Sequence, residues 1–167
     1  GSNLLVASGT QTYIQAGGRV LRGEKTMNIM VYGSGNLYMQ DGLVYGGKAA
    51  HGANIYLSGN GNLQVTGGVI RDGEATGNGG NIFSQNKDSK ITISGGQILN
   101  GQAGTNGGNI RTIQGQLTIS GGTISGGVAT EAGGNIYYEA TTASTDTVAY
   151  GEYMLQITGG TITGGNA

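Results

Sequence analysis

The strongest constraint on this chain is an internal repeat of about 26 residues. An asparagine followed by isoleucine recurs at intervals of 26, 27, 28 and 26 residues, at Asn28, Asn54, Asn81, Asn109 and Asn135. A glycine corner recurs with a similar period, and its second residue is Gly18, Gly42, Gly68, Gly96, Gly122 and Gly160. Because two separate markers keep one period, the sequence predicts a stack of similar coils.

Apolar residues alternate with polar ones inside each repeat. Leu117 and Ile119 precede one glycine corner, Ile124 follows it, and the other repeats are apolar at the same places. Short alternating runs between glycines are typical of strands with one buried face. Strands that run the same way in every repeat cannot form hairpins, but they can pair with their counterparts in the next repeat, about 4.8 Å away.

This pairing predicts an all-β fold, a parallel β-helix of about six coils with three short strands each. Similar known coils and the right-handed preference of crossovers predict that it is right-handed. The isoleucines after the recurring asparagine should then form one interior column. They are Ile29, Ile55, Ile82, Ile110 and Ile136.

Composition excludes several classes of protein. Glycine makes up 37 of 167 residues, proline is absent and only 10% of residues are charged, so the glycines are expected at structural corners and not in a flexible linker. The absence of cysteine excludes disulfides and thiolate metal sites. The 8 basic and 9 acidic residues are scattered, which argues against nucleic acid as a partner. No apolar run approaches the roughly 20 residues of a membrane span, so no membrane insertion is expected.

The repeat also suggests how the chain is organised. Residues 1–26 fit the pattern least well and are expected to be an N-terminal cap or a degenerate first coil, followed by regular coils over 27–167. Residues 140–153 exceed the normal coil length and should form a loop at the corner that also holds 58–61 and 84–89. The chain begins Gly1-Ser2 and ends within a repeat, so we expect it to be part of a longer protein.

One column of the repeat is a candidate binding surface. The residues that follow the recurring isoleucine are Met30, Tyr56, Phe83, Arg111 and Tyr137. If the isoleucines point inward, this column points outward, with successive groups about 5 Å apart. Such aromatic groups can stack on sugar rings, and Tyr138 lies beside them in the sequence. Alternatively, the groups stack on one another and shield the sheet, with Arg111 in a cation–π contact.

The asparagine column is expected to be structural. Its amides can form a ladder at a corner, satisfy backbone groups and tolerate a left-handed turn. Binding of a metal or substrate by this column is the lesser alternative.

A catalytic site is the alternative to a binding surface. Arg71, Asp72 and Glu74, with Lys48 nearby, supply the acids and bases that a polysaccharide lyase needs for calcium binding and proton abstraction. However, no carboxylate recurs in any column, and the single histidine, His51, is expected to be solvated at a corner. We therefore assign no catalytic residue, and we expect neither a metal nor a cofactor.

The segment Gly79-Gly80-Asn81-Ile82-Phe83 resembles the GGAI-type repeats of polymorphic outer-membrane proteins and autotransporter adhesins. Their F-x-x-N pattern is similar to Phe83-Ser84-Gln85-Asn86, and the likeness covers most of the chain from Asn28 onward. The broader class is the pectate-lyase-like right-handed β-helices. The resemblance implies a secreted or surface-displayed bacterial segment, either an adhesin-like stalk or a module that contacts glycans or host proteins. The alternative is a fragment of a carbohydrate-active lyase or hydrolase. Open coil ends can also stack between molecules, so end-to-end self-association is a further expectation.

Overall fold

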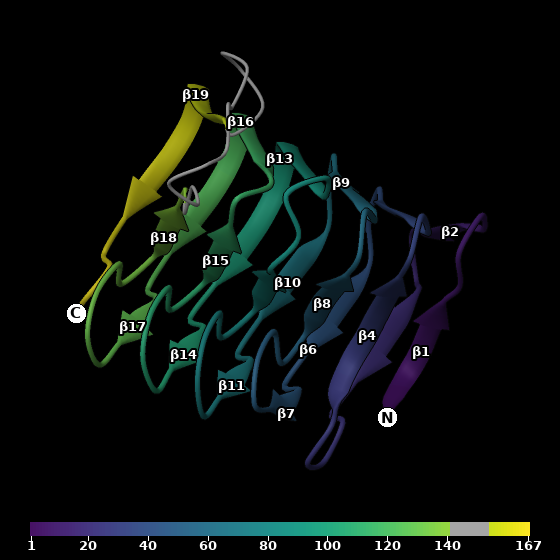
Figure 1. Ribbon diagram of the computed structural model, residues 1–167, viewed down its shortest axis with the longest axis horizontal. Helices are drawn as coiled ribbons and strands as arrows, with labels where there is room; N and C mark the ends of the chain where they lie inside the picture. Colours follow the sequence, from purple (N-terminus) through teal and green to yellow (C-terminus); the bar gives the residue numbers. More distant parts are fainter. Residues whose placement is uncertain (141–153) are drawn as a thin grey trace, which may run out of the picture.

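The computed structural model describes residues 1–140 and 154–167, and over these ranges all regular secondary structure is β. The chain winds through three parallel sheets as a β-solenoid of about five turns (Figure 1). The predicted parallel β-helix is confirmed, although its coils number about five and not six. No helix in the described ranges could span a membrane.

Sheet A contains one strand from each coil. Its strands, in spatial order, are β1 (Ser2–Val6), β4 (Met27–Tyr32), β8 (Ile55–Ser58), β12 (Ile82–Ser84), β15 (Ile110–Ile113) and β18 (Ile136–Glu139). The parallel register aligns Ile29 with Ile55, Ile55 with Ile82, and so on to Ile136. The first four isoleucines are fully buried and Ile136 packs against the same core, so the predicted interior column is confirmed.

Sheet B bends at the glycine corner. Before the corner lie β2 (Gln11–Ile14), β5 (Asn36–Met39) and β9 (Asn62–Val65), and after it lie β3 (Arg19–Leu21), β6 (Leu43–Tyr45) and β10 (Val69–Arg71). In later coils one strand runs through the corner: β13 (Lys90–Leu99), β16 (Gln116–Ser125) and β19 (Met154–Thr163). Within β13, Gly96 has φ +74°, and a Cβ there would lie 2.8 Å from the Gly67 carbonyl oxygen of the coil before. Only glycine satisfies both the backbone conformation and the close approach.

Sheet C is narrow, with two residues in each strand. Its strands are β7 (Lys48–Ala49), β11 (Glu74–Ala75), β14 (Gln102–Ala103) and β17 (Val128–Ala129). The register stacks the alanines, and the last three of them are buried. The small side chain suits the tight bend at which this sheet meets the others.

The N-terminal residues pair with the coil that follows them. β1 pairs with β4, β2 with β5 and β3 with β6, all parallel. The first coil has one more residue at its corner, where the left-handed conformation falls on Gly17 (φ +81°) and not on Gly18. This extra residue explains why the repeat is hard to recognise there.

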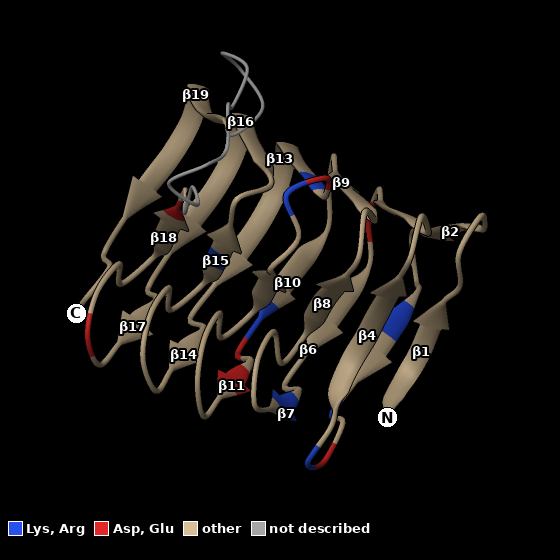
Figure 2. Ribbon diagram, viewed as in Figure 1, with Lys and Arg blue, Asp and Glu red and all other residues tan. Residues whose placement is uncertain are grey.

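The core is a set of apolar columns between the sheets. Leu63, Ile91 and Leu117 stack in register and are at most 1% exposed. Burial of one such side chain contributes roughly 1.5–3 kcal/mol, so the columns supply most of the favourable free energy of folding. Charged residues are few and scattered over the turns and short strands (Figure 2).

Candidate functional site

The junction between sheets A and B varies most from coil to coil. The connections are residues 33–35, 59–61, 85–89 and 114–115 in the coils that follow β4, β8, β12 and β15. This is the edge at which the sequence predicted variation. The predicted loop 140–153 falls at the same junction in the sequence, and residues 141–153 lie outside the described ranges.

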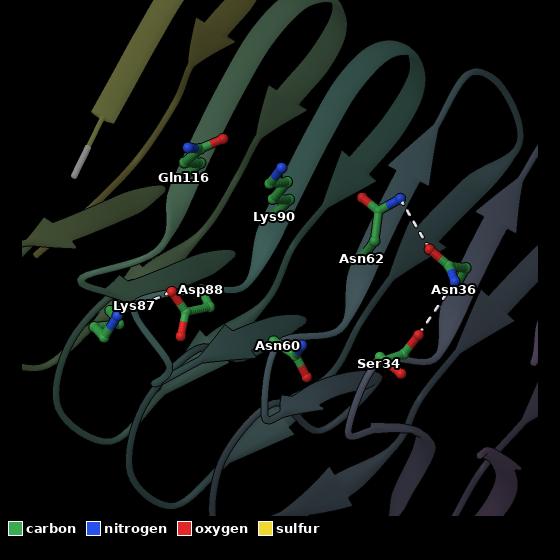
Figure 3. A pocket seen from close by; sticks show the side chains of 8 residues that line it. All are labelled: Ser34, Asn36, Asn60, Asn62, Lys87, Asp88, Lys90 and Gln116. Atoms are coloured by element: carbon green, nitrogen blue, oxygen red, sulfur yellow. Dashed lines mark hydrogen bonds and ion pairs between the residues drawn. The ribbon is translucent and has the colours of Figure 1, made fainter. Parts of the chain in front are cut away.

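A polar groove lies beside this junction (Figure 3). The residues that line it are Ser34, Asn36, Asn60, Asn62, Lys87, Asp88, Lys90 and Gln116. Its floor is a single column, because the register pairs Asn36 with Asn62, Asn62 with Lys90, and Lys90 with Gln116. Each floor residue opens a strand of sheet B, so the side chains stand about 4.8 Å apart on a rigid ladder.

Hydrogen bonds hold part of the groove in place. The Asn62 side-chain amide donates to Asn36 Oδ1 at 3.3 Å, and the Asn36 amide donates to the Ser34 carbonyl at 3.2 Å. The five-residue loop 85–89 brings Lys87 and Asp88 to one side, where they form an exposed ion pair of 3.0 Å. Within the described ranges, Lys90 has no ion-pair partner, so its ammonium group is available to a ligand.

A stacked aromatic pair lies on the same outer face, with Tyr13 exposed and Tyr38 half-buried. Tyr38 is two residues beyond Asn36 in β5, and it stacks on Tyr13 with ring centroids 4.7 Å apart. Tyr13 is 50% exposed, and its hydroxyl donates to Gln11 Oε1. Sequence reasoning missed this pair because the extra residue in the first coil hides the register of Tyr13 with Tyr38. An alignment of the apolar residues on either side, Ile14 with Met39, could have found it.

Within the predicted aromatic column, Phe83 and Arg111 are covered, whereas Tyr56 and Tyr137 are half-exposed. Phe83 is 2% exposed, and it stacks on Tyr56 (5.5 Å between centroids) and on His51 (5.0 Å). A ring that is covered in this way offers no face to a sugar. The mutual packing matches the alternative in which these groups shield the sheet.

Arg111 and Tyr137 continue the same column. The Arg111 guanidinium lies 4.7 Å from the centre of the Tyr137 ring, and the residue is 8% exposed. It donates to Asn78 Oδ1 at 2.9 Å and forms an ion pair with Glu139. The guanidinium is therefore already engaged within the protein.

Tyr138 lies on the opposite side of the sheet from Tyr137. It aligns with the buried Thr112, packs against the core and donates its hydroxyl to the Gly115 carbonyl at 2.9 Å. Tyr138 is therefore not part of the outward column, because neighbouring strand residues point to opposite faces.

His51 is partly buried and packs against its neighbours. Its Nδ1 accepts a hydrogen bond of 3.0 Å from the Asn78 backbone, and its ring stacks on Phe83. Burial, followed by the nearby charge of Arg111, lowers the pKa of His51. A lowered pKa keeps the imidazole neutral at pH 7.

The residues of the catalytic alternative are engaged in local ion pairs. Arg71 contacts Asp72 at 2.7 Å and lies over the Tyr45 ring, while Glu74 contacts Lys48 at 2.8 Å. Both carboxylates thus have a cationic partner, and both pairs are partly solvent-accessible. In the described part of the chain no group of three or more His, Cys, Asp or Glu side chains could hold a metal.

The asparagine column forms the expected ladder, and it is buried. Successive amides donate from Nδ2 to the next Oδ1 at 2.6–2.8 Å. The same amides bridge two backbone groups: Asn81, for example, donates to the Leu99 carbonyl at 2.8 Å and accepts from the Gly73 N–H at 3.0 Å. Asn3 adds a further rung that the sequence did not reveal, because it donates to Asn28 Oδ1.

These asparagines lie beside a left-handed turn and do not adopt its conformation themselves. None of the five has positive φ. A column of left-handed residues instead follows the second half of sheet B, and it includes Asp72 (φ 54°) and Asn100 (φ 53°). The ladder amides bind the backbone groups on either side of these residues, which stabilises a turn made elsewhere.

Comparison with protein-family models, with curated proteins and with solved structures finds no match to this chain. The candidate site is therefore identified from the contacts and burial of this chain's own residues.

Proposed function

We propose that this chain is a non-catalytic interaction module that binds a glycan in the polar groove between sheets A and B. The observation that carries the proposal is the groove floor, a row of amide and ammonium side chains contributed by four successive coils. We further propose that the module belongs to a secreted or surface-displayed bacterial protein, as an adhesin-like segment. The resemblance of its GGNI repeats supports this setting.

The chemistry of the groove suits sugar hydroxyls. Amide side chains both donate and accept hydrogen bonds, as hydroxyl groups do, and Ser34 adds a hydroxyl of its own. The floor repeats along the solenoid axis, so an extended polymer can contact several coils at once. Lys90, without an ion-pair partner in the described ranges, favours an acidic sugar over a neutral one.

The rigidity of the floor also supports binding. The paired strands fix the backbone of the floor, and hydrogen bonds already order the Asn36 and Asn62 side chains, which reduces the entropic cost of association. The Tyr13–Tyr38 pair, in which Tyr13 is exposed, extends the same face with aromatic surface. Tyrosine provides a large apolar area together with a hydrogen-bonding hydroxyl.

A glycan array tests the proposal. The double variant Asn62→Ala/Lys90→Ala removes one amide and the ammonium without touching the core. Each hydrogen bond contributes about 0.5–1.5 kcal/mol, so we expect affinity for the bound glycan to fall roughly tenfold. Titration calorimetry with the best array ligand measures the change, and an unchanged melting temperature shows that the fold is intact.

Two controls make the test specific. Gln97→Ala removes an exposed amide from the same strand, β13, on the far side of the glycine corner, and should leave binding unchanged. Tyr56→Ala/Tyr137→Ala tests the aromatic column. Loss of binding in that variant alone would show that the aromatic column, and not the groove, is the binding site. Absence of binding to any glycan would refute the proposal.

A further inference from the structure

The last coil exposes side chains that other coils bury. Leu155, Ile157 and Ile162 in β19 are 42%, 52% and 40% exposed. Their register partners in β16 are Leu117, Ile119 and Ile124, and each is at most 1% exposed. With part of the preceding turn they line a hollow at the end of the solenoid, formed by Gly133, Gly134, Asn135, Ile136, Tyr138, Leu155, Ile157 and Ile162.

The asparagine ladder is incomplete at the same end. Asn109 donates twice, to the Ser125 carbonyl and to Asn135 Oδ1. Asn135 donates to the Thr163 carbonyl, and its second amide hydrogen meets no acceptor in the described ranges. One strong donor thus points out of the end of the stack.

Among the described residues, the first coil has an unpaired hydrogen-bond acceptor, where the last coil has an unpaired donor. Asn3 donates to the Leu21 carbonyl and to Asn28 Oδ1, but its own Oδ1 accepts no hydrogen bond from the described residues. Leu4 and Val20, which lie in interior columns, are only half-buried. The chain therefore carries an unmatched donor at one end and an unmatched acceptor at the other.

The two ends fit each other in register. The columns place Asn3 in line with Asn135, Ile14 with Ile157, and Val20 with Ile162. A first coil laid on a last coil would complete the amide ladder and cover the exposed apolar side chains with apolar ones. Both ends run in the same direction, so the new strands would pair in parallel as the internal ones do.

We infer that the last coil of this chain binds the first coil of a second copy, head to tail. The two surfaces of this contact are different, so the interface is heterologous and leaves a free surface at each end of a dimer. Repetition of the contact gives a linear filament that continues the solenoid. The inference rests on the coil ends and is independent of the proposed glycan groove.

Register-specific cross-linking tests the contact. The chain has no native cysteine, and Leu5 and Tyr137 lie in the same outward column at opposite ends. In the double variant Leu5→Cys/Tyr137→Cys, the head-to-tail contact brings the two Cα atoms of neighbouring copies to about 4.8 Å, within the range for a disulfide. Within one molecule they are five coils apart, about 24 Å, so an internal bond cannot form.

We expect mild oxidation to produce a ladder of covalent oligomers on a non-reducing gel, with 5-to-137 linkages by mass spectrometry. The matched control Leu5→Cys/Thr92→Cys places its second thiol on the outer face of a middle coil, and it should give at least tenfold less oligomer. Equal yields from the two variants, or linkages that join only identical positions, would overturn the inference.

Light scattering on the cysteine-free chain provides a second readout. We expect the average mass to rise with concentration, and we expect Ile157→Lys to prevent the rise, because it places a charge in the contact. Ile157 is already 52% exposed, so this variant should keep its fold. Thr161→Lys, at an outward position of the same strand, is the control and should still associate. A strictly monomeric chain, or a Thr161→Lys variant that is blocked equally, would contradict head-to-tail stacking.

Discussion

Each buried asparagine of the ladder forms two kinds of hydrogen bond, one to a neighbouring asparagine and one to the backbone. Asn81, for example, joins its coil to the next through the amide ladder. It also binds the Gly73 N–H, which follows the left-handed Asp72, and the Leu99 carbonyl, which precedes the left-handed Asn100 of the next coil. All four hydrogen-bonding positions of Asn81 are occupied, and the residue is fully buried. A side chain with both donors and acceptors is required, which explains why asparagine recurs with the period of the fold.

Substitution of Asn81 should therefore be strongly destabilising. Asn81→Ala leaves the buried Gly73 N–H without its partner and removes one hydrogen bond each from the Leu99 carbonyl and from the two neighbouring ladder amides. Since each unsatisfied buried group costs about 1–3 kcal/mol, partial relaxation included, we expect a loss of about 3–5 kcal/mol in the free energy of unfolding by urea denaturation.

The isosteric variant Asn81→Asp keeps the acceptors but cannot donate when ionised, so it should be destabilised to at least a similar extent at pH 7. Asn62→Ala, in the solvent-facing amide column, is the control and should cost under about 1 kcal/mol. Equal losses at positions 62 and 81 would show that the ladder has no special role.

At this scale the sequence predicted the ladder but not the turn beside it. The left-handed column contains Arg22, Gly46, Asp72, Asn100, Gly126 and Gly164. Because its residue types vary, periodicity gives no sign of a shared conformation. The glycine that follows each of them recurs without exception, but a recurring glycine does not reveal which neighbour is left-handed.

The element that shapes each coil is the glycine corner in the middle of sheet B. The corner turns one strand into two faces without ending it, as β13 and β16 show. Its glycine is needed both for its conformation and because the coil before lies against it. These two requirements can be separated by experiment.

Gly96 and Gly9 have the same φ of +74°, but of the two only Gly96 has neighbouring atoms within 4 Å of the place that a Cβ would occupy. Gly9→Ala should cost about 1–2 kcal/mol, the strain of a left-handed L-residue. Gly96→Ala adds a contact of 2.8 Å with the Gly67 carbonyl, so we expect a clearly larger loss in thermal or urea unfolding. Equal losses would mean that conformation alone explains the glycine.

Which outward columns are accessible could not be predicted from the repeat. Side chains alternate between the inner and outer face along a strand, so the sequence predicted that Tyr56, Phe83 and Arg111 point outward. Alternation does not give the path of the connections, and His51 and Asn78 from two of these contact Phe83 and Arg111. The groove was equally hidden, since its side wall is a loop of irregular length.

At the scale of the whole molecule, the stacked coils place residues that recur with the sequence period in continuous columns. The sequence predicted the stacking and the interior columns, because these depend on residue types that repeat. It overestimated the number of turns, because the terminal segments supply strands without completing full coils. If copies join head to tail, each filament presents many grooves in line, and a long glycan would gain avidity from several weak contacts.

The stacking of successive coils can be tested most directly by distances along one outward column. Nitroxide labels on cysteine variants at Gln64, Thr118 and Gln156 lie in register, two and three coils apart. Dipolar electron paramagnetic resonance on the pairs 64/118 and 64/156 should give backbone separations of about 10 and 14 Å, with one strand spacing added per coil. Separations above about 25 Å for either pair, or a 64/156 distance shorter than that of 64/118, would contradict the stacked solenoid.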